Sequence, residues 1–345
     1  MLAVVKYGQH DGEVELRDVP EPEPGLGEVL LKVAAAGVCG SDIEMWRHVI
    51  TFAVNTPVIQ GHEFAGTVAA LGPGAEGFAV GDRVVSETAA YICGKCAYCR
   101  TGEYNLCPHR LGFGYGTNGA FCSYVRVPTR CLHRVPDAVP FEHACLTEPA
   151  CVSYNAMVVK SDPRPGEAVV VIGPGPIGLF AVQVARIVGA SPIILVGTDA
   201  DAGRLQTGKG LGATHTLTAG KDDIAAAVAD LTGPYGVPLV VDAAGNNATL
   251  KLSMDLVARN GQITKIGWGP KPVDLSLDPI ISKAARLQGT FSHTWRTWEA
   301  VIALIASGEI DMRPMVTHDM PITEWNRAYH LVEDREAVKV VLRPA

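Results

Sequence analysis

The hydrophobic and polar positions divide the chain into two parts of different character. Over the first 150 residues, short apolar runs such as "EVLLKVAAAGVCG", "EFAGTVAALG" and "GDRVV" alternate with turn segments such as "EPEPGLGE" and "GPGAEG". Short β-like runs broken by glycine and proline are typical of an irregular, barrel-like β domain. We therefore expect loops to carry much of the function of this part.

A different pattern begins near residue 150. The segment "AVVVIGPGPIGLFAVQVARIVGA" contains a buried strand, a glycine turn and then apolar residues at helical spacing. The segments "PIILVGTDADAGRLQTGKGLGA" and "VPLVVDAAGNNATLKLSMDLV" repeat this order, and "GQITKIGWG" supplies a further strand. Strands that alternate with helices predict a parallel sheet covered by helices on both faces.

The last part of the chain contains a predicted helix in "TWEAVIALIASGEI" and a predicted strand in "AVKVVLR". We expect this tail to return to the β-rich domain. The predicted fold is therefore α/β, with a doubly wound parallel sheet over residues 151–289. This sheet is inserted in a β-rich domain made of residues 1–150 and 290–345.

Composition and charge exclude several classes of protein. The 345 residues are 48% hydrophobic and 19% charged, which suits two packed domains and excludes global disorder. The formal charge of −7 and the lack of a long basic run argue against nucleic acid or an anionic membrane as partner. No apolar run approaches the ~18 residues that span a bilayer. The start of the chain predicts a strand and a turn rather than a signal peptide, so we expect a cytoplasmic protein.

Four of the nine cysteines lie close together, as Cys93-x2-Cys96-x2-Cys99-x7-Cys107. A disulfide framework fits a large chain without an export signal poorly, so we expect reduced thiols, several of them on metal. Four thiolates at this spacing predict a closed, tetrahedral structural zinc site. An iron–sulfur cluster needs the same number of ligands and is the alternative. A closed shell leaves no position for a substrate.

The turn "GPGPIG" follows a predicted strand and carries the pattern G-x-G-x-x-G. These glycines permit a tight turn, a close approach to a pyrophosphate and close packing of helix on strand. Asp199 follows about 20 residues on, where a carboxylate binds a ribose 2′-hydroxyl and repels a 2′-phosphate. NAD is therefore preferred to NADP, although Arg204 and Lys209 soften this preference. The predicted cofactor residues are Gly173, Gly175, Pro176, Ile177, Gly178, Asp199, Arg204 and Gly267.

A second candidate metal site is scattered along the chain. "GVCGSD" contains Cys39, "GHEFAG" contains His62 and Glu63, and "LTEPAC" contains Glu148. A thiolate, an imidazole and a carboxylate make three protein ligands with a fourth position free, as a catalytic zinc requires. Taken singly, the cysteine could be a small buried thiol and the glutamates solvated surface acids.

In combination, "GHEFAG", "GDRV", the four-cysteine segment, "EPACVSYNA" and "GPGPIG" resemble the zinc-dependent medium-chain dehydrogenase/reductase superfamily. The polyol (sorbitol) dehydrogenase-like group is the most similar branch, with threonine and butanediol dehydrogenases as near relatives. The resemblance implies a GroES-like catalytic domain, a Rossmann domain, and a homodimer or homotetramer. The implied reaction is the oxidation of a secondary alcohol, a polyol or sugar derivative, to a ketone with NAD. A non-catalytic, cofactor-sensing zinc protein is the alternative from another class.

The resemblance also implies roles for single residues. Cys39 and His62 match the family's catalytic zinc ligands, and Glu63 matches a carboxylate ligand of the sorbitol dehydrogenase-like members. Glu148 stands where other members have a third ligand or a glutamate that holds a zinc-bound water. Ser41 matches the hydroxyl that receives the proton of the substrate.

Two positions depart from the family pattern. Relatives often carry a proton-relaying histidine where this chain has Glu44, so Glu44 or His48 takes over, or the proton leaves through water. Sorbitol dehydrogenases place Arg-Tyr where this chain has Ser292 and His293, which weakens the case for sorbitol itself. The substrate pocket is expected to include Ser41, Trp46, Phe113, Glu148 and His293, with Phe52, Tyr115 and Trp295 as further candidates. Threonine is the second choice of substrate, because its carboxylate needs a cation in the pocket. In the candidate pocket segments, Arg47 and Arg110 are the only evident arginines.

Overall fold

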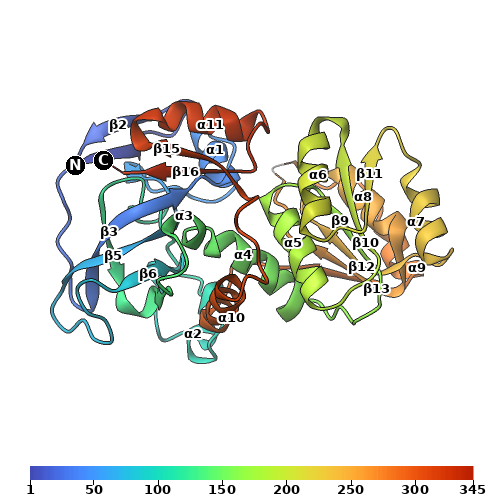
Figure 1. Cartoon of the computed structure of the whole chain (residues 1–345), viewed down its shortest axis with the longest axis horizontal. Helices are drawn as coiled ribbons and strands as arrows, with labels where there is room; N and C mark the ends of the chain where they lie inside the picture. The colour runs from blue at the N-terminus through green and yellow to red at the C-terminus, as the bar shows by residue number, and fades with distance from the viewer. Residues whose placement is uncertain (270, 345) are drawn as a thin grey trace. The chain divides into compact units, whose positions relative to one another are not determined.

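The computed structural model describes residues 1–269 and 271–344 (Figure 1). The chain forms two compact units. The first consists of Met1–Glu148, His293–Ser307 and the chain from Met312 onward. The second consists of Pro149–Ser292 with Gly308–Asp311. The tail of the chain thus returns to the N-terminal unit, as its sequence pattern predicts.

The first unit is built on two β-sheets (Figure 1). The larger has the order β15-β16-β3-β5-β6-β8, with β7 paired to β3. Its strands are β3 (Glu28–Gly37), β5 (Glu63–Leu71), β6 (Arg83–Ser86), β7 (Tyr124–Pro128), β8 (Leu132–Arg134), β15 (Val316–Pro321) and β16 (Lys339–Arg343). The smaller has the order β2-β1-β4, with β1 (Leu2–Lys6), β2 (Val14–Asp18) and β4 (Val58–Ile59).

Alternation of buried and exposed positions fixes the strands of the larger sheet. In β3, Val29, Leu31 and Val33 are buried and join one hydrophobic core with Phe64 of β5 and Leu342 of β16. A period of two residues is what places one face of a strand on a core. β16 pairs with both β15 and β3, so the C-terminal strand lies inside the sheet.

Short helices complete the first unit. They are α1 (Gly40–Trp46), α2 (Ala97–Arg100), α3 (Phe141–Ala144), α10 (Trp295–Ala306) and α11 (Trp325–Glu333), with the 3-10 turns η1 (Tyr104–Leu106), η2 (Thr129–Cys131) and η5 (Ile322–Glu324). The helix α4 (Thr147–Tyr154) begins in the first unit and continues into the second, followed by the π-helical turn η3 (Asn155–Val159).

The second unit contains one six-stranded sheet in the order β11-β10-β9-β12-β13-β14, and every pairing in it is parallel. The strands are β9 (Val169–Ile172), β10 (Ile193–Thr198), β11 (His215–Ala219), β12 (Val237–Asp242), β13 (Val257–Lys265) and β14 (Arg286–Gly289). The helices are α5 (Pro176–Ile187), α6 (Ala202–Leu211), α7 (Ile224–Thr232), α8 (Asn247–Leu256) and α9 (Asp278–Ser282), and η4 (Asp199–Asp201) precedes α6.

The strand order confirms the predicted doubly wound sheet. β9 lies at its centre, and the chain moves outward to β10 and β11 before it crosses to β12 on the other side of β9. All four residues of β9 are buried, as expected for a strand with helices on both faces. In such a sheet the switch in direction leaves a crevice at the carboxyl ends of the central strands. The glycine turn lies there, between β9 and α5.

Across the described residues, every helix falls short of the length and apolarity that a membrane crossing requires.

Candidate metal centres and cofactor site

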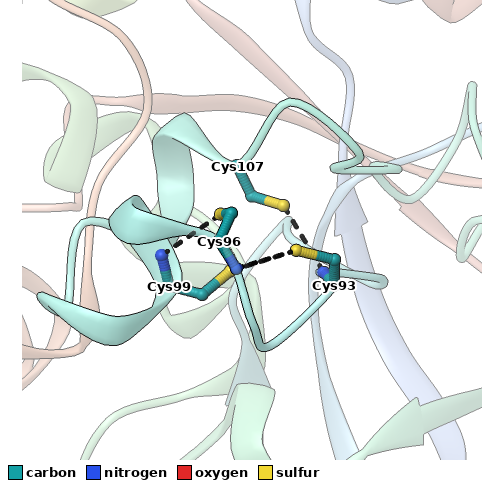
Figure 2. A group of neighbouring side chains, drawn as sticks. All are labelled: Cys93, Cys96, Cys99 and Cys107. Carbon is teal, nitrogen blue, oxygen red and sulfur yellow. Dashed lines mark hydrogen bonds between the residues drawn. The ribbon is translucent and has the colours of Figure 1, made fainter.

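The four clustered cysteines surround one point (Figure 2). Their four sulfur atoms all lie within 4.8 Å of one another, and the Sγ atoms of Cys93 and Cys99 are 4.0 Å apart. All four are free thiols. Backbone N–H groups of this segment point at the sulfurs: Cys96 donates to Cys93, and Cys99 donates to Cys96. We call the segment from Cys93 to Cys107 the cysteine lobe.

The sulfur geometry of the cysteine lobe fits zinc. A tetrahedron of Zn–S bonds of about 2.3 Å has S···S edges of about 3.8 Å, close to the distance found. The backbone N–H groups of Lys95 and Cys96 lower the pKa of Cys93 to about 6, which favours the thiolate that binds metal. With four sulfurs as donors, the shell is closed.

The second cluster combines three residues that the sheet brings together. The ligand atoms of Cys39, His62 and Glu63 all lie within 4.8 Å of one another. Cys39 precedes α1 just beyond the end of β3, while Glu63 opens β5 and pairs with Gly37 of β3. Gly37 has to be glycine, because a Cβ atom there would lie 2.3 Å from Oε2 of Glu63. Sulfur, imidazole and carboxylate donors fit a zinc ion that keeps one open position.

Asp42 supports this cluster, and the sequence analysis missed it. Its carboxylate is fully buried, and Oδ1 lies 3.8 Å from Nδ1 of His62. Oδ2 accepts a hydrogen bond of 2.9 Å from the backbone N–H of Cys39. Burial raises the pKa of Asp42, while His62 opposes that shift. At 3.8 Å these two buried atoms make no hydrogen bond, so Asp42 acts on His62 through its charge.

Lys339 is the second residue that the sequence analysis missed. Its ammonium lies 2.5 Å from both carboxylate oxygens of Glu63 and donates to the carbonyl of Val38 at 2.9 Å. Lys339 is only 2% exposed. Burial lowers its pKa, but Glu63 and Cys39 raise it by more, so its pKa lies above the usual value. The lysine therefore stays charged and offsets a buried carboxylate.

Glu148 lies outside the group of three ligands but is tied to its surroundings. It is buried, and its Oε1 is 3.1 Å from Nε2 of His293. Nδ1 of His293 accepts a hydrogen bond of 2.7 Å from the indole of Trp298. Burial raises the pKa of Glu148, but the hydrogen bond from His293 and the charge of His62 help to lower it below the usual value. Both ring nitrogens of His293 thus have partners, and its role as a substrate contact stays a prediction.

The three candidates for proton transfer lie on or next to α1. Ser41 is in its first turn and is half-buried. Glu44 lines a cavity of about 280 Å³ together with Gly40, and burial raises the pKa of Glu44. His48 is exposed, and its φ of 53° places it in the left-handed region.

The expected pocket residues have different surroundings. Trp46 and Phe113 are buried in the core of the first unit, and Phe113 packs edge-on against Phe64. The rings of Phe52 and Tyr115 pack together, with their centroids 4.7 Å apart, and Trp295 is half exposed. Their part in substrate binding stays a prediction.

Both candidate arginines already have partners. Arg47 donates two hydrogen bonds to Glu333, at 2.6 and 2.7 Å. Arg110 donates to the hydroxyls of Tyr115 and Thr88.

The glycine turn of the second unit has the geometry of a phosphate-binding loop. Gly173 has a φ of 100°, and a Cβ on Gly178 would lie 1.9 Å from the carbonyl oxygen of Gly173. At Gly175, by contrast, no atom lies within 4 Å of a Cβ position, so the backbone is open to a ligand. Pro176 and Ile177 begin α5, so this opening lies at a helix N-terminus, which favours phosphate.

Asp199 follows β10, as predicted, and its side chain is exposed. It forms an ion pair with Lys221, which the sequence analysis did not foresee. Arg204 is half-buried in α6. Gly267 follows β13 and packs on another loop, since a Cβ on it would lie 2.6 Å from the nitrogen of Gly245.

Comparison with known proteins identifies the family of the chain. Residues 25–137 match the family described as alcohol dehydrogenase GroES-like domain, and residues 176–307 match the family described as zinc-binding dehydrogenase. Sorbitol dehydrogenase of Halalkalibacterium halodurans is 39% identical and covers 100% of this chain and 99% of its own. D-arabitol-phosphate dehydrogenase of Enterococcus avium is 37% identical over 99% of this chain and 97% of its own.

A solved structure has the same fold. It is a putative zinc-binding dehydrogenase from Sinorhizobium meliloti bound to NADP, with a TM-score of 0.90, 29% identity and 99% of each chain covered. The fold and the matches together define an oxidoreductase with a GroES-like and a Rossmann domain. The chain belongs to the zinc-dependent medium-chain dehydrogenase family, in its polyol dehydrogenase branch.

Proposed function

We propose that this protein oxidises a secondary alcohol of a polyol or sugar derivative to a ketone and passes the hydride to NAD. The observation that carries the proposal is the cluster of Cys39, His62 and Glu63, whose three donor types converge within 4.8 Å. A cluster with three protein ligands leaves a place for a substrate oxygen, whereas the cysteine lobe does not. Zinc bound there supplies a Lewis acid that polarises the alcohol oxygen.

The residues of the chain supply orientation and proton transfer. Asp42 places a buried carboxylate 3.8 Å from the imidazole of His62, and Lys339 holds the carboxylate of Glu63 beside it. Ser41, two residues beyond Cys39, accepts the proton of the substrate hydroxyl. Glu44 passes that proton on, because its raised pKa and the cavity that it lines suit exchange with water.

The second unit binds the cofactor. The turn from Gly173 to Gly178 holds the pyrophosphate on the N-terminus of α5, and Asp199 holds the ribose 2′-hydroxyl. We propose NAD as the preferred cofactor. Lys221 moderates this preference, because it neutralises Asp199 and offers a cation to a 2′-phosphate. When bound in this turn, NAD would supply the acceptor for the hydride of the alcohol carbon.

Polyols and their phosphates are favoured over threonine as substrates. The similar proteins named above are a sorbitol and an arabitol-phosphate dehydrogenase. A threonine carboxylate needs a cation, and the two candidate arginines, Arg47 and Arg110, already donate hydrogen bonds within the protein. We further propose a homo-oligomer in the cytoplasm, where nine free cysteines remain reduced.

The test is NADH formation, followed by its absorbance, with a panel of C4–C6 polyols, their phosphates, butanediols and L-threonine. The proposal predicts turnover of at least one polyol or polyol phosphate, with NAD used better than NADP. Turnover of L-threonine alone would replace the substrate assignment, and no turnover of any secondary alcohol would overturn the proposed function.

A further inference from the structure

One side chain of the cysteine lobe reaches out of it. Tyr104, in η1 between Cys99 and Cys107, places its hydroxyl 2.8 Å from both carboxylate oxygens of Glu87. The same hydroxyl accepts a hydrogen bond from the backbone N–H of Trp295, the first residue of α10. Glu87 is 1% exposed, so its carboxylate is withdrawn from water, whereas Tyr104 itself is half-buried.

The N-terminus of α10 depends on that hydroxyl. The first N–H groups of a helix have no partner within the helix and need one from outside. Thr294 is the N-cap residue of α10, but its side chain makes no capping hydrogen bond. The tyrosine hydroxyl of the lobe therefore takes over part of the capping and fixes the start of the helix.

The same end of α10 is connected to Glu148 by hydrogen bonds through Trp298 and His293. The indole N–H of Trp298 can only donate, so Nδ1 of His293, which accepts it at 2.7 Å, carries no proton when the imidazole is neutral. The proton of the neutral ring must then be on Nε2, which donates to Oε1 of Glu148 at 3.1 Å. Trp298 and His293 are 1% and 2% exposed, so the tautomer is set inside the protein.

His133 links Glu87 to the same indole. His133 of β8 has Nε2 3.2 Å from Glu87 and Nδ1 2.6 Å from Glu299 of α10. Its ring stacks on that of Trp298, with centroids 5.4 Å apart and an interplanar angle of 9°. Tyr104 thus contacts the backbone of α10 directly, and Glu87 connects it through His133 to Glu299 and to the indole of Trp298.

We propose that Tyr104 is a positioning residue of the reaction centre. It fixes the first turn of α10, and through Trp298 and His293 that turn sets the place and the hydrogen bond of Glu148. The cysteine lobe then supports the reaction centre as well as the stability of the fold. The inference rests on the proposed function and on the role that the family resemblance implies for Glu148, as a zinc ligand or as the residue that holds a zinc-bound water.

The test compares Tyr104→Phe with Tyr98→Phe. Tyr98 belongs to α2 of the same lobe and is 45% exposed, so its change controls for a loss of any hydroxyl there. The first readout is solvent exchange of the Trp298 indole proton, assigned in the NMR spectrum by its loss in Trp298→Phe. We expect faster exchange in Tyr104→Phe and an unchanged rate in Tyr98→Phe.

The second readout is kinetic. Tyr104→Phe should lower kcat about ten-fold, the usual scale for a residue behind a metal site, with KM for NAD and the zinc content unchanged. Trp298→Phe, which lies outside the lobe, should lower kcat by a similar factor. In the double variant the two losses should not multiply, because both break the same connection.

Several outcomes would overturn the proposal. Unchanged indole exchange in Tyr104→Phe would do so, and so would wild-type kcat in Trp298→Phe or multiplying losses in the double variant. If Tyr104→Phe fails to fold, the kcat of Trp298→Phe decides. A wild-type kcat overturns the proposal, and a kcat lowered about ten-fold supports it. If the wild-type protein oxidises no alcohol, the proposed function fails, whereas the exchange experiment still decides whether Tyr104 controls α10.

Discussion

The two cysteine-containing clusters are similar in size but differ in how the chain builds them. The cysteine lobe takes its four sulfurs from one short segment, and the nearby backbone N–H groups serve them. The proposed reaction centre, made of Cys39, His62 and Glu63, takes its residues from just beyond one strand and from the start of another. Lys339 of the C-terminal strand contacts Glu63. A closed thiolate shell suits stability, whereas mixed donors with buried charges around them suit chemistry.

The largest effect on activity is expected from Cys39→Ala. Loss of the thiolate removes a ligand of the proposed catalytic zinc, and the oxidation of a secondary alcohol should fall by about 10²–10³-fold, since several kcal/mol of charge stabilisation are lost. The rate of NADH formation measures this loss. Cys122→Ala is the matched control, because Cys122 is a buried thiol that packs against Ala3, Val5 and Ile59, and activity should be kept. Equal activity in both variants would contradict the assignment.

Lys339→Met tests the buried ion pair beside Glu63, a feature that the described residues of the cysteine lobe lack. Methionine keeps most of the side-chain volume but leaves Glu63 without its cation. Removal of one partner of a buried ion pair costs about 3–5 kcal/mol, so urea unfolding should show a loss of that order. Lys221→Met removes an exposed ion pair and should change stability by less than about 1 kcal/mol. Similar losses in the free energy of unfolding for the two variants would show that the buried ion pair of Lys339 stabilises the fold no more than an exposed ion pair does.

Cys96→Ser tests the lobe. Loss of one thiolate weakens a closed metal site that contributes to folding, and a loss of about 2–3 kcal/mol lowers Tm by roughly 5–10 °C. Differential scanning calorimetry measures the shift, and the protein that remains folded at 25 °C should keep part of its activity. If Cys96→Ser melts as the wild type does but has no activity, the cysteine lobe would be the catalytic cluster and the assigned roles of the two clusters would be wrong.

The smallest effect concerns the cofactor. Asp199→Ala removes a charged acceptor for the ribose 2′-hydroxyl and a repulsion of the 2′-phosphate. The preference for NAD over NADP, measured as the ratio of kcat/KM values, should fall about ten-fold. Lys221→Ala should move the ratio in the opposite direction, because it removes a cation beside the 2′ position. An unchanged ratio in Asp199→Ala would exclude the proposed contact.

The sequence predicts a site well when all its residues lie within one short segment of the chain. The spacing of the cysteine lobe and the pattern from Gly173 to Gly178 lie within single segments, and the structure brings the four sulfurs together and places the glycines between a strand and a helix. The tail strand and the parallel sheet also follow from hydrophobic patterning. In each case a short stretch of sequence contains the whole geometric requirement.

The residues that escaped prediction act across long distances in the chain. Lys339 meets Glu63 across 276 positions, and no spacing rule connects them. Its only sign in the sequence is a charged residue within the apolar run "AVKVVLR". Asp42 lies in the quoted "GVCGSD", but its role depends on the approach of His62 from another strand. Trp298 shows nothing in the sequence beyond a helical apolar position.

The most direct test of the account is the return of activity as zinc is restored. The wild-type protein is stripped with a chelator, and zinc is added back stepwise while zinc per chain and NADH formation on a responsive polyol are measured. The account predicts that the stripped protein is inactive, that full activity needs two zinc ions per chain, and that Cys39→Ala binds one and remains inactive. Full activity of the stripped protein, or of Cys39→Ala, would contradict it.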